Sequence, residues 1–545
     1  MANSRHLPRA LARRLRPVAP LSRSRTRADV PNNRYPARVE TQLTAGLAPS
    51  SGINVRRRST PLPGVAETDP LSRVVSTGIF IRRRRGFRMD AISFGTDGWR
   101  ATLDTFTDER VRIVGQGVAD YLAEEGYDDP VFVGYDARDT SEGFADSLAE
   151  VLAGNGFDVL LPERDCPTPL VAYAIVDRGL SGALMITASH NPPEYNGVKF
   201  IPSDGAPALP EVTDAVAAHL AEPDFLPEAE RGTIETVDVV TPHFAHARDL
   251  VDADLSGLTV VHDAMHGSGR GVTDELLRSA GAEVVSVRDE RDPDFGGTPP
   301  EPSAENLGPL VDAVAEHDAD LGVANDGDAD RVAFVTPERG HLDENLFYAA
   351  AYEYLLESDS GPAIRTVSTT FLIDRIAEAH GEEVFETAVG FKWVANAMAE
   401  HDALIGGEES GGFSIRGHVR EKDGVLMGLL GAAAAAEEPM DDRVDRLLDA
   451  HGDIVSDKVS LDCPDSEKAR VIDDLDDALP ERVADRDIAE VVTLDGFKLL
   501  LEDGSWLLVR PSGTEPKMRI YTEASSQERA DALLTAGREL VEPLI

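Results

Sequence analysis

The sequence predicts an α/β fold, because short strand-like runs and helix-period stretches alternate along the chain. Runs rich in Val, Phe and Leu suit buried strands, and stretches with apolar residues three or four positions apart suit helices packed on a sheet. Three units of this kind occur in chain order, and their segments are Val131–Tyr135, 141–153 and Val159–Leu161, then Leu258–Val261, Leu276–Leu277 and Val284–Val285, then Thr366–Ser368 and Ile373–Ala379.

Residues 1–88 differ from the rest of the chain in charge. They contain 19 Arg, no Lys and 4 acidic residues, a net charge of +15, and they show neither helix nor strand periodicity. Such a segment does not bury a core, so we expect it to be disordered or not part of the native protein. It fits a transit peptide, a basic arm for nucleic acid, or upstream sequence before a start at Met89. The third is favoured, because the charge changes abruptly there.

The remaining residues, 89–545, are strongly acidic. The formal net charge of the chain is −45, so these residues carry −60 once the +15 of residues 1–88 is set aside. Only 7 of the 53 basic residues are Lys. An acid-rich, Lys-poor surface stays hydrated at high salt, where screening weakens its self-repulsion, and we therefore expect a halophilic protein. A body of this charge repels phosphate backbones, so no nucleic-acid partner is expected.

Cysteine content and hydropathy indicate the compartment. Cys166 and Cys463 are too few for a disulfide framework and suit the reducing cytoplasm. The longest uncharged apolar run, 424–436, is too short to span a bilayer. We therefore expect a cytoplasmic protein with no membrane partner, and no pattern predicts its oligomeric state.

A serine follows a strand-like run in Thr187–Pro192 (TASHNP). The apolar residues Ala183–Ile186 lead into this segment, and a second proline follows it. Ser189 is therefore expected on a stiff loop at the end of a buried strand. There it is a nucleophile, a phosphate carrier or an ordinary turn residue. The surrounding residues do not match Gly-x-Ser-x-Gly, the nucleophile elbow of α/β hydrolases.

Three carboxylates alternate in Asp326–Arg331 (DGDADR), between strand-like Leu321–Ala324 and Val332–Val335. Oxygen ligands on a loop between buried strands suit Mg²⁺, and the arginine brings a fixed guanidinium beside the metal. The alternative is a solvated acidic turn. An EF-hand is excluded, because it needs Gly at its sixth position and Glu at its twelfth, where this chain has Arg331 and Pro337.

Two further loops carry groups suited to a sugar phosphate. Gly406–Gly412 (GGEESGG) combines hydrogen-bonding side chains with glycines that permit close approach. Arg510–Pro516 (RPSGTEP) lies between strand-like Trp506–Val509 and Met518–Tyr521. Its guanidinium fork, its hydroxyls and the backbone N–H groups near Gly513 suit a phosphate. Taken alone, each loop is equally consistent with an ordinary surface turn.

Together, in this order and about 80 to 140 residues apart, the four loops resemble those of the α-D-phosphohexomutases. The resemblance extends from Met89 to Ile545. It implies three similar α/β domains with mixed sheets and a smaller C-terminal α+β domain, arranged around a central cleft. The domains implied are 89–236 for the phosphoserine, 249–342 for the metal, 343–452 for the sugar and 453–545 for the phosphate.

The resemblance also implies a reaction. A mutase of this family moves phosphate between C1 and C6 of a hexose through a phosphoserine enzyme and a bisphosphosugar, with glucose 1,6-bisphosphate as intermediate and activator. Ser189 matches the position of the phosphoryl carrier. One Mg²⁺ per site is implied, and its ligands would be a phosphate oxygen on Ser189 and the carboxylates of Asp326, Asp328 and Asp330.

Further residues match positions of the family's active site. Lys199, ten residues after Ser189, matches the general acid/base. His190 and Arg331 match additional catalytic positions. The substrate contacts implied by the resemblance are Arg100, Lys392, Glu408, Ser410, Arg510, Ser512, Gly513 and Thr514.

The identity of the sugar rests on a few positions. Glu409, between the two sugar-binding residues, and Lys392 in Val389–Trp393 resemble the phosphoglucomutase branch, so glucose is favoured. Against this, Arg510–Pro516 resembles the glucosamine mutases, and Gly412 stands where enzymes for mannose and glucose often carry His. The alternatives are a phosphomannomutase, a phosphoglucosamine mutase or a sugar-phosphate-binding protein without turnover.

Overall fold

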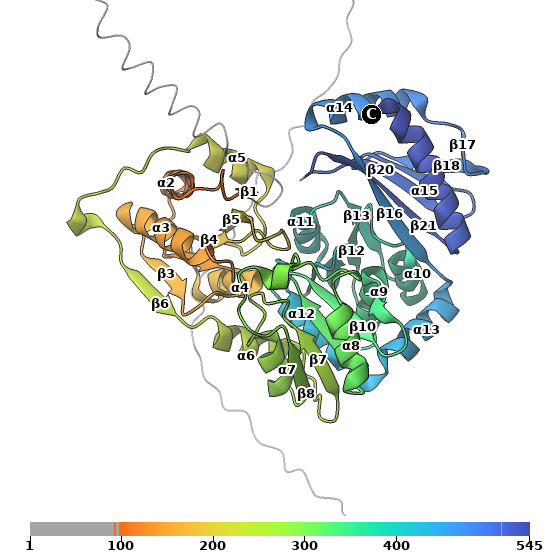
Figure 1. Ribbon diagram of the computed structural model, residues 1–545, viewed down its shortest axis with the longest axis horizontal. Coiled ribbons are helices and arrows are strands. Elements are labelled where there is room, and N and C mark those ends of the chain that lie inside the picture. Colours follow the sequence, from red (N-terminus) through yellow and green to blue (C-terminus); the bar gives the residue numbers. More distant parts are fainter. Residues whose placement is uncertain (1–91, 94–97, 514) are drawn as a thin grey trace, which may run out of the picture. The chain divides into compact units, whose positions relative to one another are not determined.

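The computed structural model describes residues 92–93, 98–513 and 515–545, in which the chain forms four sheets (Figure 1). Residues 1–88 and Thr514 lie outside the described residues, so the expectations for them stay predictions. The first three sheets are mixed and the fourth is antiparallel. The predicted fold class, three α/β domains followed by a C-terminal α+β domain, is confirmed.

The first sheet has the strand order β1-β5-β4-β2-β3-β6. β4 is buried at all five positions, as its apolar residues predict for a central strand. β2, β3, β4 and β6 run parallel, whereas β5 pairs antiparallel with β4 and β1. The elements are β1 (Trp99–Thr102), α2 (Asp108–Glu125), β2 (Val131–Tyr135), α3 (Ser141–Gly154), β3 (Val159–Pro162), α4 (Thr168–Arg178), β4 (Gly182–Ile186), β5 (Tyr195–Pro202), α5 (Pro210–Ala218), the 3₁₀ helix η1 (Glu228–Glu230) and β6 (Ile234–Val237).

The second sheet has the order β11-β10-β9-β7-β8. β7 pairs parallel with β8 and β9, and β10 then returns antiparallel to β9. This reversal places the acidic loop in the short connection between β9 and β10. The elements are α6 (Val240–Leu250), β7 (Thr259–Asp263), α7 (Thr273–Ser279), β8 (Glu283–Val287), η2 (Phe295–Gly297), α8 (Gly308–Glu316), β9 (Leu321–Asn325), β10 (Val332–Thr336) and β11 (Gly340–Leu342).

The third sheet has the order β13-β12-β14-β15. The strand predicted at Thr366–Ser368 is misplaced, since β12 ends at Thr366, whose hydroxyl lies 3.0 Å from that of Ser368 in the turn that follows. The elements are α9 (Glu344–Leu356), β12 (Ala363–Thr366), α10 (Leu372–His380), β13 (Val384–Thr387), α11 (Phe391–His401), β14 (Ile405–Gly407), β15 (Phe413–Ile415), α12 (Gly424–Glu437) and α13 (Met440–His451).

The apolar run 424–436 forms the buried helix α12 rather than a surface segment. Almost every side chain of this helix is buried, so its apolar composition is explained by packing inside the protein. Among the described residues, no helix has both the length and the apolar character needed to cross a membrane.

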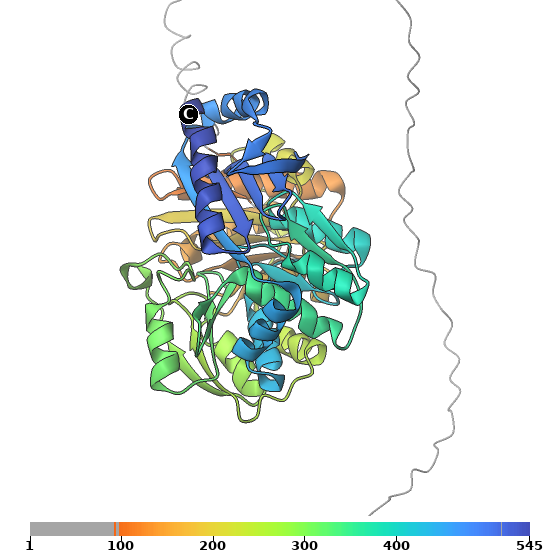
Figure 2. The same cartoon turned by 90° about the vertical axis from the view of Figure 1, so that its right-hand side faces the viewer.

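The fourth sheet, β16-β21-β20-β19-β18-β17, packs its own core against α14 and α15 (Figure 2). Leu507 and Ile520 of the sheet lie in one apolar cluster with Leu533 of α15. The elements are β16 (Val455–Asp462), α14 (Asp465–Ala478), β17 (Arg482–Val483), β18 (Arg486–Val492), β19 (Phe497–Leu501), β20 (Trp506–Pro511), β21 (Lys517–Ala524), α15 (Gln527–Val541) and η3 (Glu542–Leu544). The four domain boundaries stay predictions.

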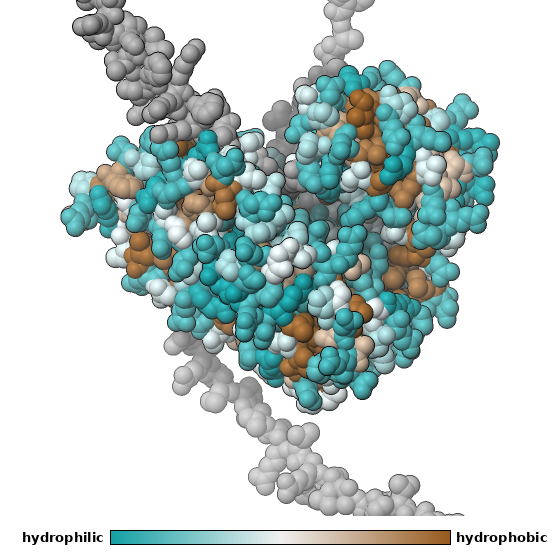
Figure 3. Space-filling model, in the orientation of Figure 1, coloured by the Kyte–Doolittle hydropathy of each residue, from teal (hydrophilic) through white to brown (hydrophobic). Residues whose placement is uncertain are grey.

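The face shown in Figure 3 is mainly hydrophilic, with apolar residues in small separate patches. Large hydrophobic side chains that are exposed among the described residues include Val176, Phe225 and Leu494. Scattered apolar residues of this kind are ordinary for a soluble surface.

Candidate active site

Ser189 lies on the loop between β4 and β5, where the backbone turns sharply. Its φ of +51° is uncommon for a residue other than glycine, and its N–H donates to Thr187 Oγ1 at 2.8 Å. The side chain is 1% exposed, and its Oγ donates to Asp326 Oδ2 at 2.7 Å. The turn therefore directs the hydroxyl toward the acidic loop of the second sheet.

Arg138 holds the serine loop in place. Its two terminal nitrogens donate to four backbone carbonyls of the loop, and the nearest of these to the hydroxyl is Ser189 O at 2.8 Å. Its Nε donates to Asp136 Oδ2 at 3.0 Å, and both side chains are buried. A paired guanidinium that spans four carbonyls makes this loop rigid.

The acidic loop approaches the serine loop through its backbone. A Cβ atom at Gly327 would lie 2.6 Å from Ser189 O, so only glycine permits this approach. Thr168, at the start of α4, also bridges the two sheets, because its N–H donates to Asp328 O at 2.9 Å and its Oγ1 donates to Asp328 Oδ2 at 2.6 Å. The structure therefore brings the predicted serine and the predicted acids together.

The three carboxylates form a crowded, buried group. Oxygens of Asp326, Asp328 and Asp330 lie within 4.8 Å of one another. Burial, with the charges of the other two acids, holds the pKa of Asp326 well above its usual value. Within the described residues, Oδ1 of Asp328 and Oδ1 of Asp330 have no hydrogen-bond partner. Hard oxygen ligands with unsatisfied acceptors fit a divalent cation such as Mg²⁺.

Two lysines contact the acidic loop. Lys199 on β5 donates from Nζ to Asp328 Oδ2 at 3.0 Å and to Asp330 Oδ2 at 2.9 Å. Burial alone lowers the pKa of Lys199, but the charges of these two acids outweigh burial and raise that pKa above its usual value. Lys422 Nζ lies 3.4 Å from Asp330 Oδ2 and 2.8 Å from Glu421 Oε1. Lysine charge therefore partly compensates the three carboxylates.

His190 lies beside the seryl oxygen, and Arg331 contacts the acidic loop through its backbone. His190 Nδ1 is 3.3 Å from Ser189 Oγ. The charge of Arg331, followed by burial, holds the pKa of His190 well below its usual value, so its imidazole is neutral at neutral pH. Arg331 donates its backbone N–H to Asp326 Oδ1 at 3.1 Å. Arg100 on β1 reaches Asn191 Oδ1 of the serine loop from Nη1 at 3.4 Å.

The sugar loop packs on the strand that follows the acids. Val332 N–H donates to Gly411 O at 3.0 Å, and a Cβ atom at Gly411 would lie 2.6 Å from Val332 O. Glu408 is buried, its Oε1 accepts from Gly390 N–H at 2.9 Å, and Ser410 is partly exposed. A Cβ atom at Gly412 would lie 2.4 Å from Lys422 Cδ. A side chain at position 412 would therefore displace this lysine.

The phosphate loop belongs partly to a strand. Arg510 was expected on the loop but lies on β20, since the ladder with β21 continues through Pro511. Ser512 is buried and Gly513 is exposed. Lys468 donates to the carbonyl oxygen of Ser512 at 2.6 Å, which fixes the loop to α14. Lys392, on the first turn of α11, is partly exposed.

Lys422, Arg138 and Thr168 were not found by sequence reasoning. No local pattern marks Arg138 or Thr168, because their partners lie far away in the chain. Lysine is so rare in this chain that each lysine is a candidate for a specific ion pair, and this rarity could have pointed to Lys422. Only 7 lysines occur, and Lys199, Lys422 and Lys498 are buried.

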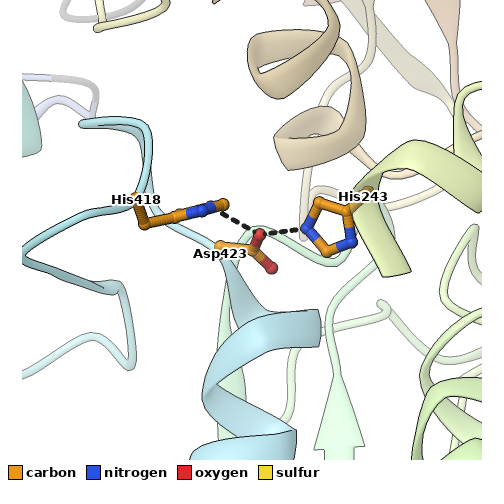
Figure 4. A group of neighbouring side chains, drawn as sticks. All are labelled: His243, His418 and Asp423. Carbon is orange, nitrogen blue, oxygen red and sulfur yellow. Dashed lines mark hydrogen bonds and ion pairs between the residues drawn. The ribbon is translucent and has the colours of Figure 1, made fainter. Parts of the chain in front are cut away.

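A second group of possible metal ligands is His243, His418 and Asp423, in which both oxygens of the carboxylate accept hydrogen bonds (Figure 4). Nε2 of His243 and Nε2 of His418 lie 2.6 and 2.9 Å from the same oxygen, Asp423 Oδ2. The other oxygen, Oδ1, caps α12 by accepting from Leu426 N–H at 2.7 Å. The arrangement ties α6 and the loop after β15 to the first turn of α12. A Cβ atom at Gly424 of that turn would lie 2.3 Å from Arg331 O.

Comparison with known families covers most of the chain. Four family models match, and their descriptions are phosphoglucomutase/phosphomannomutase alpha/beta/alpha domain I at residues 91–227, domain II at 241–340, domain III at 343–451 and the C-terminal domain at 461–539. Each model covers most strands of one of the four sheets, whereas β6 and most of β16 lie outside the matched ranges.

Individual relatives match over nearly their whole length. A protein of Methanopyrus kandleri named probable phosphoglucosamine mutase is 35% identical over 446 residues, which is 81% of this chain and 95% of that protein. A phosphoglucomutase/phosphomannomutase of Thermococcus kodakarensis is 34% identical over 459 residues, 82% of this chain and 98% of that protein. A crystal structure assigned to a phosphomannomutase of Thermus thermophilus has 33% identity and a TM-score of 0.72, covering 83% of this chain and 99% of that one.

Proposed function

This chain belongs to the phosphoglucomutase/phosphomannomutase family, and we propose that it moves a phosphoryl group between C1 and C6 of a hexose by way of Ser189. It is an enzyme of the isomerase class, a phosphohexomutase. The assignment of the serine rests on the hydrogen bond of 2.7 Å from Ser189 Oγ to Asp326 Oδ2. That contact places a strand-end hydroxyl against the acidic loop, where a cation would balance phosphoryl charge.

In the proposed cycle, phosphorylated Ser189 donates its phosphoryl group to the free hydroxyl of a hexose phosphate. The bond between Oγ and phosphorus breaks, a bond from phosphorus to the sugar oxygen forms, and the sugar hydroxyl loses its proton. The bisphosphosugar reorients and returns its other phosphoryl group to Ser189, which releases the isomeric hexose phosphate. Turnover therefore needs a proton acceptor near the hydroxyl and positive charge near the phosphate.

The acids are proposed as the metal ligands. Asp326, Asp328 and Asp330, with a phosphate oxygen on Ser189, would hold one Mg²⁺. When bound, this ion neutralises negative charge on the transferring phosphoryl group. The chain itself supplies a rigid loop, with Thr168 holding Asp328 by two hydrogen bonds.

Lys199 and His190 are proposed to hold protons at the two reacting oxygens. Lys199 is proposed as the general acid/base for the sugar hydroxyl. Its ion pairs with Asp328 and Asp330 raise its pKa above the usual value and favour the charged form, so the ammonium is the form that is ready to donate a proton. His190 is neutral and lies 3.3 Å from the seryl oxygen, so it is able to accept a proton there. Arg331 keeps this imidazole neutral through its charge.

The remaining predicted residues are proposed to bind substrate. Glu408 accepts hydrogen bonds from sugar hydroxyls, and Ser410 both donates and accepts. Positively charged and hydroxyl-bearing residues bind the phosphate that is not reacting, with Arg510 offering two parallel N–H donors. The proposed phosphate contacts are Arg100, Lys392, Arg510, Ser512, Gly513 and Thr514.

Glucosamine phosphate is proposed as the preferred substrate, in place of the glucose phosphate expected from Glu409 and Lys392. Support comes from the Methanopyrus kandleri relative, named for this sugar, and from the glucosamine-type sequence of Arg510–Pro516. Glu409 is also compatible, because a carboxylate next to Glu408 would attract an ammonium group on the sugar. Glucose and mannose phosphates are the alternative substrates.

Two measurements test this proposal. Ser189→Ala should lower turnover about a thousandfold or more and abolish a phosphate-sized adduct in the intact mass, because no other hydroxyl replaces the carrier. Ser466 is exposed on α14, so Ser466→Ala is the matched control and should keep both normal turnover and the phosphate-sized adduct. Near-normal turnover of Ser189→Ala contradicts the mechanism. A tenfold preference of the wild-type enzyme for glucose or mannose 1-phosphate over glucosamine 1-phosphate contradicts the sugar but not the mechanism.

A further inference from the structure

The guanidinium of Arg510 is held from behind by a carboxylate. Arg510 Nε donates to Asp495 Oδ2 at 2.9 Å, and the two side chains are only 8% and 19% exposed. Asp495 lies in the turn before β19, the strand that pairs with β20. A guanidinium is a rigid planar fork, so an anchor at Nε determines where its two terminal nitrogens point.

The same carboxylate oxygen also holds the segment that leads into α11. Val389 N–H donates to Asp495 Oδ2 at 3.1 Å. The next residue, Gly390, donates its N–H to Glu408 Oε1 at 2.9 Å. Three hydrogen bonds, joined through the backbone between Val389 and Gly390, therefore link the proposed phosphate-binding guanidinium to the proposed sugar-binding carboxylate.

Packing around Asp495 makes its position rigid. The following residue, Gly496, has a φ of +84°, and a Cβ atom there would lie 2.2 Å from Val509 O. This turn therefore packs directly on the backbone of β20. Lys498, two residues later, donates from Nζ to Glu386 Oε1 at 2.7 Å and anchors β19 to β13. A carboxylate presented by such a turn is able to orient its partners.

We propose that Asp495 is a positioning residue that couples the phosphate subsite at Arg510 to the sugar subsite at Glu408. This inference rests on the function proposed above. Asp495 aims the guanidinium and fixes the residues before α11, so that the distal phosphate and the sugar hydroxyls are bound in one relative placement. The bisphosphate must be held in two successive orientations, and a fixed distance between the subsites serves both.

The first test compares Asp495→Ala and Asp495→Asn with Asp476→Asn, a matched control whose side chain is exposed on α14. KM for glucosamine 1-phosphate should rise about tenfold in Asp495→Ala, while kcat changes less than about threefold, because Ser189 and the acids are untouched. Asn retains an acceptor oxygen, so the rise in Asp495→Asn should be smaller. The control should match the wild type. Thermal unfolding curves show whether each variant is folded.

The second test measures coupling, which a merely structural role would leave unchanged. In the wild-type background, the effects of Arg510→Lys and Glu408→Gln on KM should be non-additive, whereas in the Asp495→Ala background they should add. The positioning role is wrong if Asp495→Ala leaves KM within twofold of wild type, or if it leaves the coupling between Arg510 and Glu408 unchanged. Provided that Arg510→Lys still raises KM, such a result leaves the proposed phosphate-binding role of Arg510 intact. If Arg510→Lys leaves KM unchanged, the phosphate clamp and this inference both fail.

Discussion

Asp328 is one of three buried carboxylates in the acidic loop, and a shape-preserving substitution there separates metal binding from folding. Asp328→Asn keeps an acceptor for Thr168 Oγ1, which lies 2.6 Å from Asp328 Oδ2, but removes one anionic ligand. The Mg²⁺ concentration for half-maximal activity should therefore rise at least about tenfold, while the fold survives. A magnesium titration of activity and an unfolding curve recorded in EDTA measure the two effects.

Asp312→Asn is the control for this substitution, because Asp312 is exposed on α8, a helix that packs on the sheet from which the acidic loop extends. It should leave the magnesium titration unchanged. The alternative of a solvated acidic turn does not fit the burial of the three acids, which are at most 2% exposed. Should the Asp328→Asn enzyme need no more Mg²⁺ than wild type, and EDTA inhibit neither, the buried acidic loop does not bind a cation that the reaction needs.

Residues in short motifs were predictable from sequence, whereas residues that reach the site by packing were not. Ser189 and Asp326 meet although 137 residues separate them, and each was found because its own loop carries a recognisable pattern. Arg138 acts through four carbonyls that depend on the path of a loop more than 50 residues away. No local pattern encodes such a distance. Lys422 likewise reaches Asp330 only because α12 packs against the acidic loop.

At the scale of elements, the contact between β19 and β13 contains a titratable group. Lys498 is fully buried, donates to Glu386 Oε1 at 2.7 Å, and lies 4.2 and 4.6 Å from the ring centres of Phe371 and Trp506. Burial, aided by the charge of Arg365, lowers the pKa of Lys498 to about 8. In the unfolded chain this pKa is about 10.4. The unfolded state therefore binds an extra proton between these two values.

It follows that the free energy of unfolding contributed by Lys498 rises as pH rises from about 8 to about 10, by about 1–3 kcal/mol, and is constant below that window. Lys498→Met should lack this rise. Urea unfolding at pH 7 and pH 9.5, followed by Trp506 fluorescence in a background with Trp99→Phe and Trp393→Phe, measures the difference. A pH dependence that is the same in Lys498→Met as in the parent assigns the rise to another group.

Element positions were predictable where the apolar pattern is strong. Val131–Tyr135 forms β2 with the predicted bounds, because an apolar run this short and rich in Val and aromatic residues favours a buried strand, whereas the longer run 424–436 forms helix α12. The errors occur where hydroxyls or turn residues meet a strand end. β12 stops at Thr366 and not at Ser368, and β20 continues into the loop as far as Pro511. The C-terminal end of β20 is determined by its pairing with β21, and a sequence pattern does not show how far such a neighbouring strand extends.

At the scale of the whole molecule, most of the few lysines are at least partly buried. All 7 lysines are described by the structure, and Lys458 alone among them is exposed. Three others are buried, at the acidic loop or in the contact between β19 and β13, where an ammonium makes specific ion pairs. The composition predicted a Lys-poor surface, but it did not show which lysines remain inside.

From the net charge of −60 on residues 89–545 we predict that the stability of the protein depends on salt. Like charges on one surface repel over about 10 Å at 0.1 M salt and over about 3 Å at 1 M, so the compact state is penalised most in dilute buffer. The midpoint of thermal unfolding should therefore rise by about 10 °C or more between about 0.1 M and 2 M KCl. NaCl at equal ionic strength is the control and should act alike, because screening depends on ionic strength and not on the cation. Equal midpoints in dilute and concentrated KCl would mean that surface repulsion is not what limits stability, and that the acidic composition is unrelated to salt.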